Sequence, residues 1–386
     1  MMNLVGPLMS TERANKTVCF MAIELSKMGW VIAMLTPLSN KISLRSIPCG
    51  AVEQLMEIVD QTINRVMQTT GESVQVVSCY EAGYDGFWLH RFLEARGIIN
   101  HVLEAASLLV NRKARRAKTD RLDAEKLVRV LMAYCRGEPK VCSLARPPSV
   151  EDEDAKRLHR ERQFLMKERV QHIGRIKGLL AAQGIYDFRP GRKDWRNRLA
   201  ELKTGDGRPL PSRLKSEIDR QCQRLALVDA MLKEIDQERD AVVEAKNASS
   251  ETVARIQRLA HLKGIGPQIA TVLGTEIFYR EFANRRSLGS YLGLTPSPFR
   301  SGGMDRDQGI SKAGNPRGRT VMIELAWLWL RYQPQSGLAR WFKARTNGLK
   351  GRLRRIAIVA VARRLAISLW RYLETGLIPA GAELKA

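Results

Sequence analysis

The chain has 386 residues, more than one hydrophobic core usually accommodates, and its length therefore predicts two or three structural units. Its 64 lysine and arginine residues exceed its 40 aspartate and glutamate residues, so the formal net charge is +24 and nucleic acid is favoured as the partner over a membrane. The six cysteines include no CxxC pair and the five histidines stand apart from them, which argues against a disulfide framework and a zinc ribbon.

Residues 1–148 form the first predicted domain. Three apolar or alternating runs between Lys16 and Pro48 predict an antiparallel meander of strands. VQVVSCYE and IINHVLEA follow as strands, while AVEQLMEIVDQTINRVM, DGFWLHRFLEARG and TDRLDAEKLVRVLMAYCRG are helical, the last with Thr119 as its N-cap. This order predicts an α/β domain in which helices cover a mixed sheet.

Residues 149–248 are predicted to form a helical hairpin of the coiled-coil type. Apolar residues keep helical spacing from Met166 to Leu180 and again from Leu214 to Val242, in a heavily charged background. The polar, turn-rich segment from Tyr186 to Arg213 is expected at the tip of this hairpin. The narrow apolar stripe fits an intramolecular helix pair and an oligomer equally well.

Residues 249–386 are predicted to be mostly helical. Two helices joined by Gly264-Ile265-Gly266 resemble a helix-hairpin-helix element, in which Gly264 and Gly266 would let backbone N–H groups approach a phosphate. A plain helical hairpin with a glycine turn is the alternative. The stretch SGGMDRDQGISKAGNPRGR, residues 301–319, is too rich in glycine for a helix and too charged for a core strand, and is expected to be a loop.

Four carboxylates in the first domain are candidates for a metal site. Glu24 ends the first strand and Glu81 the fourth, while Asp120 and Asp123 share a face on the first turn of the later helix. If the first and fourth strands are parallel neighbours, the four acids meet at one edge of the sheet and offer the hard oxygen ligands that Mg²⁺ prefers. Each acid taken alone is also explained as an ordinary structural charge.

Several motifs together resemble a known family of transposases. AIELSKMGW, SCYEAGYDGFWL and KTDRLDAEKL, and after the helical hairpin LKGIGPQIATVLGTEI, GSYLGLTPSPFRSGG and GISKAGNPRGR, look like the insertion-sequence transposases with a DEDD-type, RuvC-like nuclease domain and a serine-bearing C-terminal domain. The similarity runs from about Cys19 to about Leu330.

The resemblance implies an RNase H-like (RuvC-like) fold for the N-terminal domain, a coiled-coil linker, and a recombinase guided by a bridge RNA that is transcribed from the end of the element. It assigns the four acidic positions of the family to Glu24, Glu81, Asp120 and Asp123. The family has aspartate where this chain has Glu24, and the extra methylene of glutamate moves the carboxylate by roughly an ångström, more than a catalytic site usually tolerates.

The same resemblance implies that Ser301, in FRSGG, is a nucleophile. A serine that attacks a phosphodiester forms a phosphoserine and conserves the bond energy for rejoining, which suits a recombinase better than a hydrolase. Gly302 and Gly303 would leave room for the phosphate beside the backbone. The cations that would neutralise its oxygens are Arg306, Lys312, Arg317 and Arg319. Ser311 is the other candidate serine, although GISK is equally typical of a helix N-cap.

Two basic zones are expected to bind nucleic acid. The first precedes Asp120 and contains Arg112, Lys113, Arg115, Arg116 and Lys118. The second is the arginine-rich helix GRLRRIAIVAVARRLAISLWRYL, whose apolar face is expected in the core while its arginines remain free for phosphate. Core packing is expected for Trp327, Trp329 and Trp341, whereas Trp195 is the tryptophan expected to stack on bases.

The sequence thus predicts a transposase that cuts and rejoins DNA with Mg²⁺ and Ser301. Its expected partners are DNA at the element ends and the target, a guide RNA, and further copies of the chain in a dimer or tetramer. The opening MMNLVGPLMSTERANK lacks the pattern of a secretory signal, so the cytoplasm is expected. One alternative is a metal-dependent nuclease or Holliday-junction resolvase, which would need the acids but not the serine. The other is a nucleic-acid-binding copy that has lost catalysis.

Overall fold

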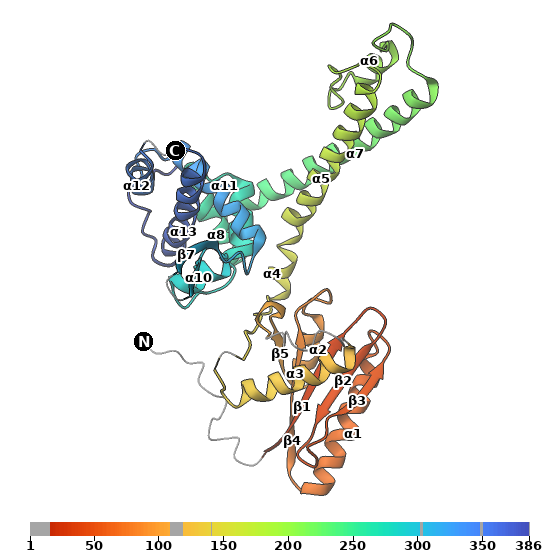
Figure 1. Cartoon of the computed structure of the whole chain (residues 1–386), viewed down its shortest axis with the longest axis vertical. Helices are drawn as coiled ribbons and strands as arrows, with labels where there is room; N and C mark the ends of the chain where they lie inside the picture. The colour runs from red at the N-terminus through yellow and green to blue at the C-terminus, as the bar shows by residue number, and fades with distance from the viewer. Residues whose placement is uncertain (1–15, 109–118, 140, 302–303, 348–349, 386) are drawn as a thin grey trace. The chain divides into compact units, whose positions relative to one another are not determined.

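The computed structural model describes residues 16–108, 119–139, 141–301, 304–347 and 350–385 (Figure 1). The chain divides into two compact units, Met1–Pro148 and Ser149–Ala386. The first unit is an α/β domain, and the second contains the helical hairpin together with the C-terminal helices. Each unit has its own hydrophobic core.

A five-stranded mixed sheet forms the centre of the first unit. Its strands are β1 (Lys16–Leu25), β2 (Trp30–Leu35), β3 (Ser43–Ile47), β4 (Ser73–Glu81) and β5 (Ile99–Leu103), in the order β3-β2-β1-β4-β5. Strands β1, β2 and β3 are the predicted antiparallel meander, and β1 is parallel to β4, as is β4 to β5. The predicted mixed sheet is therefore confirmed.

Helices cover both faces of this sheet (Figure 1). They are α1 (Val52–Thr70), α2 (Trp88–Glu94) and α3 (Asp120–Cys135), and a 3-10 turn spans Ala105–Ser107. Met21 and Ile23 of β1 pack with α1 and α2, whereas the intervening Ala22 packs with α3. This alternation is the side-chain period of a strand that is buried on both faces.

The second unit begins with the helical hairpin. It consists of α4 (Val150–Asp154), α5 (Arg157–Ala181), α6 (Trp195–Glu201) and α7 (Ser212–Glu244), with α5 and α7 side by side (Figure 1). Ion pairs join Arg162 to Asp236 and Arg175 to Glu217, so residue numbers rise along one helix as they fall along the other. The predicted antiparallel pair is confirmed within one chain.

The tip of the hairpin is a small folded cap rather than an open turn. Its buried residues include Phe188, Trp195 and Leu199, which pack with Ile176 of α5 and Ile218 of α7. Trp195 is 5% exposed, so the expectation that this tryptophan stacks on bases was wrong. The apolar residues scattered through a polar segment are enough to close a local core, and Trp195 provides its largest side chain.

The C-terminal part packs helices around one core with a two-stranded sheet at its edge. The helices are α8 (Glu251–Ala260), α9 (Pro267–Val272), α10 (Arg285–Tyr291), α11 (Pro316–Tyr332), α12 (Gly337–Thr346) and α13 (Gly351–Thr375), and Leu273–Ile277 is a π-helical turn. The core contains Trp329, and the half-buried Trp341 packs against it, so core packing is confirmed for these two tryptophans, whereas Trp327 is 40% exposed and does not belong to the core. Among the described helices, none has the length and hydropathy to cross a membrane.

Much of residues 301–319 lies in a strand and a helix rather than in a loop, which corrects the sequence prediction for residues 304–310 and 316–319. Strand β6 (Pro296–Ser301) pairs antiparallel with β7 (Met304–Ile310), and Pro316 begins α11. A strand in a two-stranded sheet does not require an apolar core face, so the charges that argue against a core strand allow this one. Ser301 is therefore the last residue of a β-strand.

Candidate functional site

The two glutamates of the predicted metal site lie at the ends of neighbouring parallel strands. Ile23 of β1 is in register with Tyr80 of β4, and Glu24 and Glu81 are the next residues of these strands. Ala22 and Cys79, two residues earlier, both face α3, so the strand period puts the two glutamates on that same face. Glu24 is half-buried and Glu81 is exposed.

Helix α3 brings the two aspartates to the same face of the sheet. Thr119 is its N-cap, as predicted, and its hydroxyl accepts a hydrogen bond from the backbone N–H of Leu122 at 3.3 Å. Asp120 and Asp123 occupy the first turn, where the helix dipole favours negative charge. Residues from Ala124 onward pack against the sheet, so the aspartates lie at the start of a helix that covers the glutamate face.

The donor types suit Mg²⁺, but the four acids do not form a closed ligand set. Carboxylate oxygens are the ligands that this hard cation prefers. Among the described residues, no group of at least three histidine, cysteine, aspartate or glutamate side chains is close enough to hold a metal ion. The basic run with Arg112, Lys113, Arg115, Arg116 and Lys118 lies outside the described residues, as do Gly302 and Gly303. The side chains of Ser301 and Arg306 also lie outside the described part of the structure.

The segment after β7 is held against the end of α10 and the stretch that leads into β6. The backbone N–H of Ser311 donates to Thr295 at 2.8 Å, and that of Asn315 donates to Tyr291 at 2.7 Å. Gly314 lies between them with φ +77°, and a Cβ atom there would stand 2.2 Å from the carbonyl oxygen of Tyr291. Only glycine fits this close approach of two backbones.

The polar side chains of the segment after β7 make different contacts. Asn315, not Ser311, caps α11, and its Oδ1 accepts from the backbone N–H of Gly318 at 3.0 Å. Arg319 donates to the carbonyl oxygens of Leu292 and Ala313, so part of its guanidinium holds the backbone together. Lys312 is exposed, with a positive φ of 57° that is uncommon outside glycine.

A buried glutamate that the sequence analysis did not single out lies under this segment. Glu276 accepts hydrogen bonds from His159 Nε2 at 2.9 Å and from Arg160 Nε at 2.8 Å, and its Oε2 accepts one from Asn315 at 3.2 Å. Tyr291 donates to its backbone carbonyl at 2.8 Å. The sequence contains one indication of this site, a single acid within the apolar run TVLGTEIF. A carboxylate in such a run is expected to be buried, and a buried carboxylate requires partners.

The charges around Glu276 are mutually stabilised. Burial alone would raise the pKa of Glu276, but the hydrogen bonds from His159 and Arg160 outweigh it and hold that pKa well below its usual range. Burial lowers the pKa of the nearby Lys156 to about 8, and its Nζ lies 3.6 Å from the centre of the Tyr279 ring. Glu276 also lies in the π-helical turn, a feature that is frequent at functional sites.

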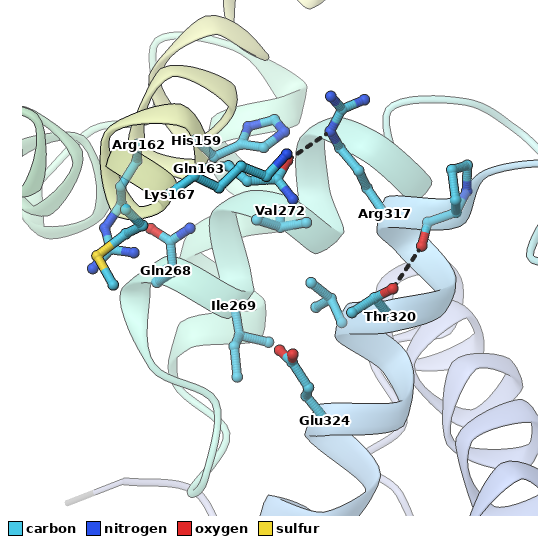
Figure 2. Close-up of a pocket in the computed structure, with 13 residues that line it drawn as sticks. His159, Arg162, Gln163, Lys167, Gln268, Ile269, Val272, Arg317, Thr320 and Glu324 are labelled. Atoms are coloured by element: carbon cyan, nitrogen blue, oxygen red, sulfur yellow. Dashed lines mark hydrogen bonds between the residues drawn. The ribbon is translucent and has the colours of Figure 1, made fainter. Parts of the chain in front are cut away.

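A pocket of about 510 Å³ lies beside this network between α5, α9 and α11 (Figure 2). Arg317 projects into it and donates from Nε to Oε1 of Gln163 at 3.0 Å (Figure 2). Arg162 and Lys167 of α5 add further cations, and Glu324 lines the pocket from α11, near Ile269 (Figure 2). Arg317 therefore lines a pocket of mixed polar and apolar side chains between the helical hairpin and the C-terminal helices.

The predicted helix-hairpin-helix element has the expected helix–turn–helix geometry. Gly264 has φ +88°, and a Cβ atom there would lie 3.0 Å from Cβ of Tyr332, so packing also requires glycine. Gly266 is the N-cap of α9 and no side chain caps the helix. A Cβ at Gly266 would meet nothing within 4 Å, which leaves the backbone open to a ligand.

Comparison with known proteins gives one consistent result. Residues 256–341, which include Glu276, Ser301 and Asn315, match the profile of the Transposase IS116/IS110/IS902 family. The chain is 45% identical over 380 residues to the Sinorhizobium fredii protein y4rJ, named a transposase, with 97% of this chain and 96% of that protein covered. It is 29% identical over 263 residues to the transposase for insertion sequence element IS1328 of Yersinia enterocolitica, with 66% and 71% covered. It is 27% identical over 263 residues to the transposase for insertion sequence element IS1111A of Coxiella burnetii, with 66% of each covered.

Proposed function

The chain belongs to the IS116/IS110/IS902 family of transposases, and from this premise we propose that it cuts and rejoins DNA with two groups, the acids of the first unit and Ser301 of the second. The observation that carries the proposal is the register of β1 and β4, because it puts Glu24 and Glu81 side by side on the face covered by α3. Glu24 and the α3 aspartates, which come from distant parts of the sequence, are thereby brought to one face of the sheet.

The residues that would hold Mg²⁺ are Glu24 and Glu81 with Asp120 and Asp123. The bound cation would neutralise charge on the scissile phosphate. Because these acids do not form a closed ligand set in the described residues, binding requires Asp120 and Asp123 to approach the strand ends. Glu24 has a longer side chain than the aspartate of the family pattern, which changes how far its carboxylate reaches from β1.

Ser301 is proposed as the nucleophile. Its Oγ attacks the scissile phosphorus and loses its proton, a phosphoserine bond forms, and the bond between phosphorus and the leaving strand oxygen breaks as that oxygen takes up a proton. Rejoining reverses these changes, because a strand hydroxyl attacks the phosphoserine and releases Ser301. The end of β6 positions the backbone of this serine, because the pairing of β6 with β7 fixes Ser301 opposite Met304.

The partners of the reaction are proposed on the same basis. DNA at the element ends and at the target is the substrate, and a guide RNA would supply the target sequence by base pairing rather than by side-chain contacts. Because Ser301 and the acids belong to different units, both must reach one phosphate, within one subunit or across the subunits of a dimer or tetramer.

A recombination assay tests the proposal. The purified protein is mixed with DNA that carries the two element ends and a target, with Mg²⁺ or with a chelator, and RNA that copurifies is sequenced. Joined products that require Mg²⁺, together with RNA from the flank of the element, support the proposal. Cleavage without rejoining would favour the resolvase alternative, and the absence of both reactions would favour a binding protein that has lost catalysis.

A further inference from the structure

Helix α12 and all but the last turn of α13 carry positive charge with no acid among their residues. Between Glu324 and Glu374 the sequence contains no aspartate or glutamate. The basic residues in the same interval are Arg331, Arg340, Lys343, Arg345, Lys350, Arg352, Arg354, Arg355, Arg363, Arg364 and Arg371. In a chain that already has an excess of cations, this is a concentrated source of positive potential.

Most of these cations are exposed, Arg363 being half-buried, and they are not engaged by acids in the described part of the chain. Arg345, Arg352 and Arg355 are all exposed, and within the described part of the chain no salt bridge joins any basic residue of α12 or α13 to an acid. The contacts that Arg354 and Arg364 do make are with tryptophans. Arg364 lies 4.1 Å from the ring centre of Trp341, and Arg354 lies 5.7 Å from that of Trp327. Arginine stacked on an aromatic ring keeps its charge available to a phosphate.

A groove of about 790 Å³ opens between these two helices. Trp341 and Arg345 of α12 line one side, and Leu353, Ile356 and Arg364 of α13 line the other. Leu353 and Ile356 are each 55% exposed. The groove therefore combines exposed apolar side chains and a partly exposed tryptophan with a rim of arginines.

We propose that this groove binds an unpaired stretch of nucleic acid, with phosphates on the arginines and bases against Trp341, Leu353 and Ile356. The inference rests on the proposed function in one respect, that the chain handles nucleic acid. Phosphates alone would explain the arginines but not the apolar lining, because a duplex keeps its bases inside the stack. Unpaired bases present flat apolar faces, and single-strand sites pair such aromatic or apolar surfaces with cations.

A lipid surface fits the groove less well. The later part of α13 is buried in the core through residues such as Val361, Leu365 and Leu369. A helix held in this way cannot lay its apolar face into a membrane. An acidic peptide would satisfy the arginines, and it is therefore included as a competitor in the test.

The test measures binding of the full chain by fluorescence anisotropy. The ligands are a short mixed-sequence oligonucleotide as single-stranded RNA, as single-stranded DNA and as duplex DNA, with polyglutamate and anionic phosphatidylserine vesicles as competitors. The groove variant combines Arg345→Ala with Leu353→Ser. Its matched control combines Arg371→Ala with Leu377→Ser, which removes an exposed arginine and an exposed leucine that do not line the groove.

We expect the groove variant to lose about tenfold in affinity for one or both single strands and less than about threefold for the duplex, while the control changes all three equally and slightly. Equal losses for single strand and duplex, or no loss, would overturn the groove assignment and leave the proposed function intact. Competition by polyglutamate or vesicles that the groove variant abolishes would also overturn it. If the unmodified chain binds neither single strand nor duplex, the groove assignment and the proposed function both fail.

Discussion

Nε2 of His159 lies 2.9 Å from the carboxylate of Glu276, although 117 residues separate them in the chain. Both side chains are almost fully buried, at 3% and 4% exposure. The same glutamate contacts Asn315 and Tyr291, the two residues whose backbone hydrogen bond holds the segment after β7 against the end of α10. One buried acid therefore joins the base of the helical hairpin to the base of the strand that ends in Ser301.

Replacing this acid should destabilise the second unit. Glu276→Gln leaves the buried His159 and the guanidinium of Arg160 without their charged acceptor, so the free energy of unfolding should fall by about 3 kcal/mol. Urea unfolding followed by circular dichroism measures the change. Glu281→Gln removes an exposed carboxylate nearby and is the control, expected to stay within about 0.5 kcal/mol of the unmodified chain. Equal midpoints for the two variants would contradict the role given to Glu276.

The contribution of Glu276 to the free energy of unfolding should depend on pH. The folded state holds the pKa of Glu276 below its ordinary value of 4.5, so its stabilisation is complete above that pH and is lost as the pH falls toward the folded value. The difference in unfolding free energy between the unmodified chain and Glu276→Gln should therefore shrink as the solution is acidified below 4.5. Urea titrations at a series of pH values measure it. A difference that grows on acidification would show that the sign is wrong.

Gly314 should tolerate no side chain. In Gly314→Ala the new Cβ would stand 2.2 Å from the carbonyl oxygen of Tyr291, so the segment after β7 must move and recombination should fall at least about tenfold. Gly309→Ala is the matched control, because Gly309 also has a positive φ, +95°, but a Cβ atom at Gly309 would meet nothing within 4 Å. It should cost about 1 kcal/mol of stability and leave recombination nearly unchanged. Similar recombination by both variants would refute the packing argument.

The recombination rate should depend on the charge of the side chain at Glu24 more than on its length. If its carboxylate binds the metal, Glu24→Gln should lose at least about a hundredfold in recombination rate, because the amide is a much weaker ligand for Mg²⁺. Glu24→Asp restores the residue of the family pattern and should retain or increase the rate. The measurement is joined product formed at several Mg²⁺ concentrations. Activity of the Gln variant equal to that of the unmodified chain would remove Glu24 from the site.

The first unit was largely predictable because each of its elements follows a simple period. Strands β1 and β4 are apolar runs with a glutamate at or next to their last residue, and Thr119 marks the start of α3. The parallel pairing of β1 and β4 then follows from the order of elements, so the shared face of Glu24 and Glu81 was accessible from the sequence.

The contacts of the second unit were not predictable in the same way. The partners of Glu276 come from helix α5, more than a hundred residues earlier, and no local pattern encodes a bond of that separation. Charged residues also misled the prediction for residues 304–310, because a two-stranded ladder needs no apolar face. The expectation for Trp195 failed for a different reason. The segment around it is polar, but it still contains enough apolar residues to bury this tryptophan in a local core.

The central claim, that Ser301 forms a covalent bond to DNA, is tested most directly by trapping the adduct. The protein is incubated with end-labelled element DNA and Mg²⁺ and denatured, and the labelled peptide is identified by mass spectrometry. Ser311→Ala serves as the matched control for Ser301→Ala, and binding of DNA is measured for both. We predict a denaturation-resistant adduct on Ser301 that persists in Ser311→Ala and disappears in Ser301→Ala, whose DNA binding stays nearly unchanged. An adduct on another residue, or strand exchange by Ser301→Ala at the unmodified rate, would contradict the claim.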